Sequence, residues 1–366
     1  MTVPTTTGEV TAKWLTEALR ASGTICEAAS VSAVDADIAG VGVGFMGEVG
    51  KLTLTYDGDV GDLPNKMVVK FPTMSPQVRA LMWSSRVYER EHRFYQNLAS
   101  KTPFRTPNVY HVTCNTSASA EEPEDYILLL EDLSAFTEGD QLAGLTLEQT
   151  KTVLNALARH HAAFWNGAGL EDAPYVPDVN GPMNLSGSVM YAVSIDAFKQ
   201  VFGHTLRDEM VPVADAFGDK MVDMLNRFHA SPHTLMHHDF RADNFFFTDD
   251  GGVAIIDWQT IARGGVGYDL GYLLSQNLDS ALRREHEDAL LRGYHETLLG
   301  HGASDYSYEQ LFQDYRLGIM YGWVIPVFAV GTLDASSERA VALWTSVIER
   351  SQDAIFQHNC QEFILG

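Results

Sequence analysis

The sequence is short of cysteine, of basic residues and of long apolar runs, and each shortage argues against a class of protein. Three widely separated cysteines without a C-x-x-C pair indicate neither a disulfide framework nor a cysteine-ligated zinc site. With 25 Lys and Arg against 48 Asp and Glu, and no basic cluster, nucleic acid is a poor partner. The longest uncharged run, residues 317–333, contains Pro326 and suits a kinked core helix better than a membrane span.

Length, charge and the first residues set further bounds. A chain of 366 residues is long enough for two domains or for one two-lobed domain. The net charge of −23 either suits a cationic small substrate or simply keeps the protein in solution. The first residues, MTVPTTTGEV, lack the basic and apolar segments of a signal peptide, so we expect a cytoplasmic protein.

The predicted elements divide the chain into a strand-rich first third and a helix-rich remainder. Strands are expected at residues 51–56, 66–71 and 126–130. Helices are expected at residues 11–21, 77–98, 147–165, 214–229, 281–299, 308–320 and 338–356. We therefore predict an α+β fold with a small β-rich N-terminal lobe (1–130), a hinge (131–134) and a large helical C-terminal lobe (135–366).

The segment from Asp239 to Asp257 carries the strongest functional signal. Two short apolar runs, 245–247 and 253–256, flank the turn sequence Thr-Asp-Asp-Gly-Gly, which predicts a β-hairpin. A hairpin returns its two ends to one place, so Asn244 and Asp257 should lie side by side, with Asp239 facing them. Two hard oxygen ligands and a separate carboxylate suit Mg²⁺ carrying a nucleotide, with a base for an incoming hydroxyl. The pattern indicates phosphoryl transfer.

A glycine-rich segment precedes the strand at 51–56. Gly42, Gly44 and Gly47 fit the pattern G-x-G-x-x-G. A Rossmann loop would open a helix, whereas this segment runs into an alternating strand, and the spacing of a P-loop is absent. One remaining interpretation is a glycine hairpin whose backbone covers nucleotide phosphates. The other is an ordinary β turn with flexible glycines.

Lys70 lies inside an apolar strand, where an ammonium group needs a counter-charge. It shares a face of the strand with Val68. In the following helix, Glu91 falls on the apolar stripe, whereas Glu89 falls on the polar side. We therefore predict that Glu91 pairs with Lys70, beside a nucleotide phosphate. The alternative is an edge lysine that extends to water.

These features occur in an order that resembles the protein-kinase-like fold. More closely, the chain resembles the aminoglycoside phosphotransferase and choline kinase superfamily, and within it the ecdysteroid-kinase-like branch. The similarity rests on EHRFY at 91–95, ILLLEDL at 127–133, HAAFW at 161–165, DWQ at 257–259 and GYDL at 267–270. It covers roughly residues 40–275.

The resemblance implies roles for the catalytic segment. Asp239 would orient or deprotonate the acceptor hydroxyl. Asn244 and Asp257 would hold Mg²⁺ against the phosphates of ATP. His237 would be a structural residue of the loop, and Asp269 would brace that loop.

The resemblance also implies a nucleotide-binding half. Lys70, positioned by Glu91, would hold the α- and β-phosphates under the glycine loop. The backbone from Glu131 to Leu133 would meet the adenine edge, and Val68 would pack on the adenine face.

The sequence departs from the kinase pattern at several points. His238 stands where a glycine is usual, and Asp257 is followed by Trp-Gln rather than Phe-Gly. No long activation loop is present. This argues for a small-molecule kinase and against a protein kinase. A nucleotide-binding module without transfer activity, similar to a pseudokinase, is the alternative.

The acceptor is the least defined part of the prediction. Aromatic and methionine side chains of the helical lobe either form its core or line a cleft for a sizeable apolar alcohol, such as a steroid-like natural product. The set consists of Met190, Tyr191, Phe198, Phe202, Met210, Met221, Met224, Met320, Tyr321, Trp323 and Phe328. An aminoglycoside or choline-type acceptor remains the alternative.

Two groups of histidines allow other interpretations. His237 and His238, together with Asp239 and Asp257, would have to converge to form a transition-metal cluster, which adjacent side chains do poorly. His160 and His161 lie on a predicted helix, where we expect buried, hydrogen-bonded core histidines.

Overall fold

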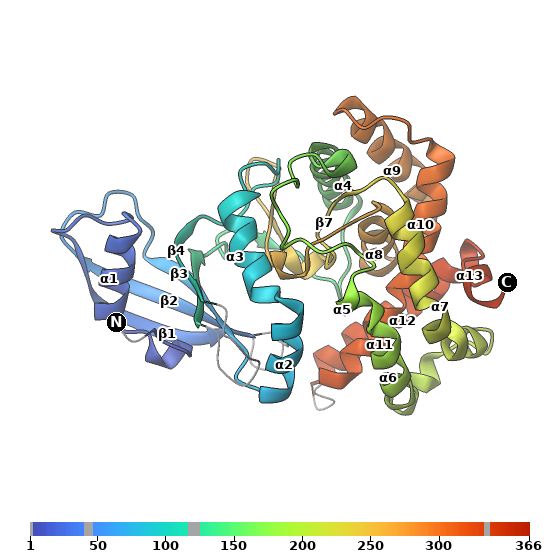
Figure 1. Cartoon of the computed structure of the whole chain (residues 1–366), viewed down its shortest axis with the longest axis horizontal. Helices are drawn as coiled ribbons and strands as arrows, with labels where there is room; N and C mark the ends of the chain where they lie inside the picture. Colours follow the sequence, from blue (N-terminus) through green and yellow to red (C-terminus); the bar gives the residue numbers. More distant parts are fainter. Residues whose placement is uncertain (1–2, 40–46, 116–124, 333–336) are drawn as a thin grey trace. The chain divides into compact units, whose positions relative to one another are not determined.

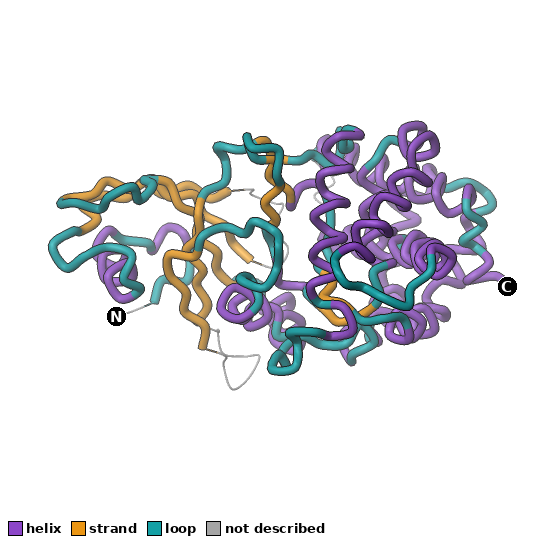
Figure 2. Tube along the Cα trace, turned by 90° about the horizontal axis from the view of Figure 1, so that it is seen from above, coloured by secondary structure: helices purple, strands orange, loops and turns teal. Residues whose placement is uncertain are grey.

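The computed structural model of the chain describes residues 3–39, 47–115, 125–332 and 337–366. It consists of two compact units. Unit 1 comprises Met1–Asn97 and Thr106–Ala135, and unit 2 comprises Leu98–Arg105 and Phe136–Gly366. The longer strands belong to unit 1, and most of the helices belong to unit 2 (Figure 2), so the predicted α+β class is confirmed.

Unit 1 contains a five-stranded antiparallel sheet in the order β1-β2-β3-β5-β4. Its strands are β1 (Ser30–Ala39), β2 (Gly47–Asp57), β3 (Lys66–Pro72), β4 (Val109–Asn115) and β5 (Asp125–Glu131). The three predicted strands correspond to β2, β3 and β5. The prediction missed the edge strands β1 and β4, because their partly exposed side chains do not give a clear apolar alternation.

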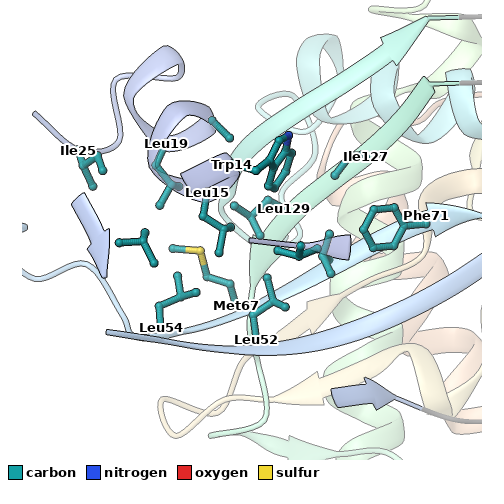
Figure 3. Packing of buried hydrophobic residues seen from close by; sticks show 14 of the residues in the cluster. Trp14, Leu15, Leu19, Ile25, Leu52, Leu54, Met67, Phe71, Ile127 and Leu129 are labelled. Atoms are coloured by element: carbon teal, nitrogen blue, oxygen red, sulfur yellow. The ribbon is translucent and has the colours of Figure 1, made fainter. Parts of the chain in front are cut away.

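One face of the sheet packs against helix α1 (Ala12–Ala21). The side chain of Thr11 accepts a hydrogen bond from the amide of Trp14 and so begins the helix. The apolar face of α1 then meets the inward-facing residues of β2, β3 and β5 (Figure 3). This core includes Trp14, Leu15, Leu19, Leu52, Met67, Val69, Phe71, Ile127 and Leu129.

The opposite face of the sheet contacts α2 (Pro76–Ser85) and α3 (Val87–Asn97). The prediction of one continuous helix at 77–98 was wrong, because Arg86 adopts a left-handed conformation with φ of 54°. The buried guanidinium of Arg90 donates to the Ser85 carbonyl, which stabilises the end of α2. The break lets α3 set its own direction against the sheet.

Unit 2 is mostly helical (Figure 1). Its longer helices are α4 (Leu147–Ala163), α6 (Gly187–Phe202), α7 (Met210–Ala230), α8 (Gly267–Asn277), α9 (Ser280–Gly300), α10 (Tyr308–Gly322) and α12 (Glu338–Gln357). The shorter ones are α5 (Pro182–Leu185), α11 (Val324–Ala329) and α13 (Glu362–Leu365). The five long helices predicted for this lobe are confirmed as α4, α7, α9, α10 and α12, and α4 begins with the capping box of Thr146 and Gln149. The prediction missed α6 and α8.

Short strands of unit 2 carry the segment predicted to be catalytic. They are β6 (Thr137–Glu138), β7 (Thr234–Met236), β8 (Phe245–Phe247), β9 (Val253–Ile255) and β10 (Ala262–Gly264). The strands β6, β8 and β9 form one small sheet, and β7 pairs with β10. Helix α8 lies entirely buried beside α10, where a Cβ on Gly318 would meet the Gly267 carbonyl oxygen at 1.8 Å.

The described part of the apolar run, residues 317–332, is helical but interrupted. Helix α10 ends at Gly322 and α11 begins at Val324, and Trp323 between them is fully buried. The predicted kinked core helix is therefore confirmed. Among the helices that the structure describes, none is long and apolar enough to cross a membrane.

Candidate active site

The predicted catalytic loop follows β7 in unit 2. His237 is fully buried, and both of its ring nitrogens form hydrogen bonds with backbone groups. Its Nε2 donates to the Ile256 carbonyl at 2.9 Å, and its Nδ1 accepts from the Asp239 amide at 3.3 Å. The ring thus connects the loop to the end of the hairpin. With both nitrogens engaged, His237 has no ligand atom to offer the transition-metal cluster considered above.

Asp269, in the first turn of α8, stabilises the same loop through hydrogen bonds to its backbone. Its carboxylate accepts the amide hydrogens of His237 at 2.8 Å and of His238 at 2.9 Å. Burial alone would raise the pKa of the Asp269 carboxyl, but the hydrogen bond and charge of His161, with those of His237, bring the pKa below its ordinary value. The carboxylate therefore stays ionised without solvent contact.

The residue between the histidine and the aspartate has an unusual backbone. His238 has φ of 68°, in the left-handed region that favours glycine, which gives a physical reason for the glycine usual at this point. Its ring lies on Tyr268, with the ring centroids 4.2 Å apart. Stacking on Tyr268 and the hydrogen bond to Asp269 stabilise a conformation that costs about 1 kcal/mol or more for a side chain of this size.

The predicted hairpin is confirmed. Phe245 pairs with Ile255 across β8 and β9, and the turn closes between Thr248 and Gly252. The Ile256 amide donates to the Asn244 carbonyl at 3.1 Å, which brings the two ends of the hairpin together.

Asp257 follows Ile256 directly, and its backbone is left-handed, with φ of 67°. The chain therefore turns away from the β8–β9 pair at Asp257, at the end of the hairpin where Asn244 begins it. Within unit 2, the fold therefore places Asn244 and Asp257 side by side, as predicted.

Asp239 and Asn244 are in direct contact. The Asn244 Nδ2 donates to the Asp239 carbonyl at 2.9 Å and to the Asp239 Oδ2 at 3.2 Å. The amide oxygen of Asn244 and the carboxylate of Asp257 are oxygen donors of the kind that Mg²⁺ takes. The two residues fit the proposed metal by donor type.

Arg241 is the residue of this loop that our sequence analysis missed. Its Nε lies 3.4 Å from the Asp239 Oδ2, and its Nη1 donates to the Asp243 Oδ2 at 2.7 Å. Burial alone would lower the pKa of the Arg241 guanidinium, but the carboxylates of Asp239, Asp243 and Asp257 raise it. The cation offsets part of the repulsion among these carboxylates. The sequence signal that could have identified Arg241 is its position, a basic residue two positions after Asp239.

In unit 1, Lys70 pairs with Glu91, as the helical stripe predicted. The Lys70 Nζ lies 2.8 and 2.9 Å from the two Glu91 oxygens, and the Glu91 side chain is 1% exposed. Glu89 instead pairs with Arg86 on the surface of α3. Tyr126, which the sequence analysis also missed, donates its hydroxyl to the Glu91 Oε2 at 2.8 Å. A buried tyrosine on β5 thus orients the carboxylate that holds the lysine.

The other predicted nucleotide contacts also lie in unit 1. Val68 is half-buried on the face of β3 that carries Lys70. At the end of β5, the Glu131 amide donates to the Asn108 carbonyl at 2.9 Å, and the Leu133 side chain is buried.

Of the three loop glycines, Gly42 and Gly44 lie outside the described residues. Gly47 begins β2, where a Cβ would meet the Phe71 carbonyl oxygen at 2.2 Å, so a close backbone approach requires glycine.

The two helix histidines are buried and hydrogen-bonded, as expected. The His160 Nδ1 lies 2.7 Å from the Thr102 hydroxyl and its Nε2 lies 2.8 Å from the Leu235 carbonyl. The His161 Nε2 lies 3.3 Å from the Asp269 Oδ2, so this core residue also supports the predicted catalytic loop.

The aromatic and methionine set of unit 2 belongs mainly to the core. All of its members except Met190 and Phe328 are buried. The Trp323 indole donates to the Tyr191 hydroxyl, which donates to the Ala214 carbonyl. The core interpretation is confirmed, and these residues lend no support to an apolar cleft.

A family model described as the ecdysteroid kinase-like family matches residues 41–304. An uncharacterised kinase-like protein of Caenorhabditis elegans is 25% identical over 187 residues, which are 48% of this chain and 48% of that protein. The chain thus matches about half the length of this curated relative.

Solved structures with similar folds include two small-molecule kinases. A spectinomycin phosphotransferase in complex with ADP and spectinomycin is 12% identical, with a TM-score of 0.54, over 96% of this chain and 99% of its own. A choline kinase from Cryptosporidium parvum is 10% identical, with a TM-score of 0.53, over 89% and 91%. At such identities the similarity shows the fold alone, which is the protein-kinase-like fold predicted above. Because the family model covers more than two thirds of its residues, the chain belongs to the ecdysteroid kinase-like family.

Proposed function

We propose that the protein is an ATP- and Mg²⁺-dependent kinase that transfers the γ-phosphate to a hydroxyl group of a small molecule. The main support is the braced carboxylate of Asp239. It accepts a hydrogen bond from the side chain of Asn244. The Asn244 carbonyl in turn accepts from the amide of Ile256, the residue directly before Asp257. A carboxylate separate from the metal ligands, beside two oxygen donors for Mg²⁺, is the arrangement that suits phosphoryl transfer to a hydroxyl.

In this proposal, Asp239 orients the acceptor hydroxyl and takes its proton. Its Oδ2 accepts from Asn244 and Arg241, so its Oδ1 is the atom that meets the hydroxyl. The acceptor oxygen attacks the γ-phosphorus, and ADP leaves with the electrons of the broken bond. Asn244 and Asp257 hold Mg²⁺, which when bound neutralises charge on the phosphates.

The nucleotide-binding half of the proposal rests on unit 1. Lys70, oriented by Glu91 and Tyr126, would bind the α- and β-phosphates. Val68 would pack on the adenine. Since the Glu131 amide already donates to Asn108, the adenine edge would meet other backbone groups of residues 131–133, among them the Leu133 amide.

For the acceptor, we propose a hydroxylated, steroid-like natural product. This rests on the family to which the chain belongs, because the buried aromatic set gives no pocket to argue from. Aminoglycosides and choline, substrates of the wider superfamily that the sequence resembles, are the competing acceptors. The acidic surface would attract them, whereas it gives no advantage to a neutral sterol.

The test is phosphate transfer by the full chain from ATP or GTP with Mg²⁺, across a panel of sterols, aminoglycosides and choline. We expect Asp239→Asn to lower kcat with the accepted alcohol by about 10²–10⁴-fold, the usual contribution of a general base. Asp257→Asn should weaken the binding of Mg²⁺ and so raise the Mg²⁺ concentration needed for half-maximal activity. Asp249→Asn is the matched control, because Asp249 is an exposed carboxylate in the turn of the same hairpin.

Two outcomes would contradict the proposal. If ATP binds and every acceptor stays unphosphorylated, the protein is a nucleotide-binding module rather than a kinase. If the Asp239→Asn variant transfers phosphate as fast as the Asp249→Asn control, Asp239 is not the base.

A further inference from the structure

A second group of ligand-type side chains lies in unit 2, outside the proposed phosphoryl-transfer site. Asp178, His229 and His233 each offer one ligand atom, and these atoms lie within 4.8 Å of one another. Among the residues that the structure describes, this is the group of histidine and carboxylate side chains close enough to share a metal ion. Our sequence analysis missed the group, because Asp178 lies 51 residues before His229 in the sequence and only the fold brings it to the two histidines.

The fold fixes the three positions through backbone contacts of their own segments. Asp178 forms a β-bridge with Arg263, and the next amide, that of Val179, donates to the Arg263 carbonyl at 2.7 Å. His229 lies in the last turn of α7. His233 follows four residues later, directly before β7. The group is therefore a product of the fold and not of one flexible loop.

The His233 imidazole is held as a metal-binding histidine is, by a hydrogen bond at one ring nitrogen. The His233 Nε2 donates to the His229 carbonyl at 2.6 Å, which directs the lone pair of its Nδ1 outward from that contact. Metal-bound histidines use their second nitrogen in this way to fix the ring. The His229 Nδ1 is buried and has no hydrogen-bond partner among the described residues, which is uncommon for a buried polar atom.

The local charges suit a cation. His229 lies at the C-terminal end of the 21-residue helix α7, where the helix dipole is negative. Asp178 adds a carboxylate. The Nη2 of Arg263 donates to two carbonyls, those of Leu170 and Ala173, at 3.0 and 2.6 Å. Among the described residues, Arg263 and Asp178 form no salt bridge, so this part of the cation is engaged elsewhere.

We propose that Asp178, His229 and His233 form a binding site for a divalent transition-metal ion such as Zn²⁺. Two imidazole nitrogens and one carboxylate oxygen suit Zn²⁺, with a fourth position left for water or an anion. Bonds of about 2.0–2.2 Å would bring the ligand atoms to roughly 3.3 Å from one another. Rotation of the exposed Asp178 side chain supplies much of that movement. Mg²⁺ prefers oxygen ligands, so the site differs in kind from the one proposed at Asp257.

The metal would join three segments of unit 2: the bridge at Asp178, the end of α7, and the start of β7. Three residues separate His233 from His237, so the ion would restrain the entry to the catalytic loop. Metal binding to the folded state alone also raises the melting temperature.

The test is Zn²⁺ binding to the untagged full chain after metal removal, measured in competition with a chromophoric chelator. We expect one ion per chain in the wild type, and affinity at least about 10-fold lower in His233→Ala, His229→Ala and Asp178→Asn. His301→Ala is the matched control. This exposed histidine also lies at a helix C-terminus and contacts the carbonyl four residues before it, as His233 does.

Thermal unfolding separates lost binding from lost folding. Metal-free Asp178→Asn should melt like the metal-free wild type, because Asp178 is exposed, and the same Zn²⁺ concentration should raise the melting temperature of the variant less than that of the wild type. An excess of Mg²⁺ should not displace Zn²⁺. Wild-type binding no tighter than that of a His229→Ala, His233→Ala double variant would overturn the proposal. So would an equal loss of affinity in His301→Ala.

Discussion

Replacing Asp269 with Asn tests the support of the catalytic loop most directly. The carboxylate accepts two backbone amide hydrogens, from His237 and His238, and faces the His161 ring. An Asn side chain keeps only one of the two oxygens, so one of the two backbone amides loses its acceptor. The NH₂ group of the Asn then faces that amide, and both groups are donors. A hydrogen bond to a buried charge contributes about 1.5–3 kcal/mol, and an unpaired buried donor costs about 1–3 kcal/mol. A neutral amide is easier to bury than a carboxylate. We therefore expect a net loss of about 2–4 kcal/mol in the free energy of unfolding.

Two measurements on Asp269→Asn distinguish this explanation from a general loss of packing. Urea unfolding gives the change in stability, and amide hydrogen exchange gives the protection of the His237 and His238 amides. Both amides should exchange faster in the variant, while amides of α12 change only as global stability does. The exposed Asp249→Asn variant should unfold within about 0.5 kcal/mol of the wild type. If Asp269→Asn matches that control in stability and keeps both amides protected, the bracing argument is wrong.

Two further substitutions test buried polar contacts in the two units. Tyr126→Phe removes one hydrogen bond to the Glu91 carboxylate and should cost about 2 kcal/mol of stability in urea unfolding; a loss below about 0.5 kcal/mol would show that Lys70 alone orients Glu91. Burial and the charge of His161 hold the pKa of His160 well below its ordinary value of 6.5. Below pH 6.5 the ring therefore takes up a proton when the protein unfolds. This proton uptake lowers the free energy of unfolding as the pH is lowered. His160→Gln should be less stable at pH 7.5 but should lose up to about 1.4 kcal/mol less per pH unit between pH 6.5 and 5.5; an unchanged slope in urea unfolding would mean that other groups cause the acid sensitivity.

The local parts of the candidate site could be predicted from the sequence because spacing alone determines them. A turn between two short apolar runs brings Asn244 beside Ile256 whatever the rest of the chain does, and helical periodicity selects Glu91 over Glu89. The same reasoning failed where a single residue overrides a periodic pattern. Arg86 ends α2 with a left-handed backbone, although neither glycine nor proline marks the break.

Contacts between distant segments were beyond the sequence analysis. Tyr126 lies on β5 and Glu91 on α3, so their hydrogen bond depends on how the helix docks on the sheet. Arg241 lies within the motif itself, but its electrostatic role depends on how closely the fold brings Asp239 and Asp243 to its guanidinium. Residue type and spacing identify which groups carry charge, whereas packing decides which other groups orient them.

The histidines of unit 2 show why residue type alone does not assign a role. His160 and His161 are adjacent on one helix and both fully buried, yet the first contacts a hydroxyl and a carbonyl, and the second contacts the carboxylate that braces the catalytic loop. His237 uses one nitrogen within its loop and the other on the Ile256 carbonyl at the end of the hairpin, so neither is left for a metal ion. His233 uses one nitrogen on a carbonyl and keeps the other for a ligand. An imidazole has two nitrogens, so its role follows from how many of them the fold already occupies. The proposed zinc site rests on this count.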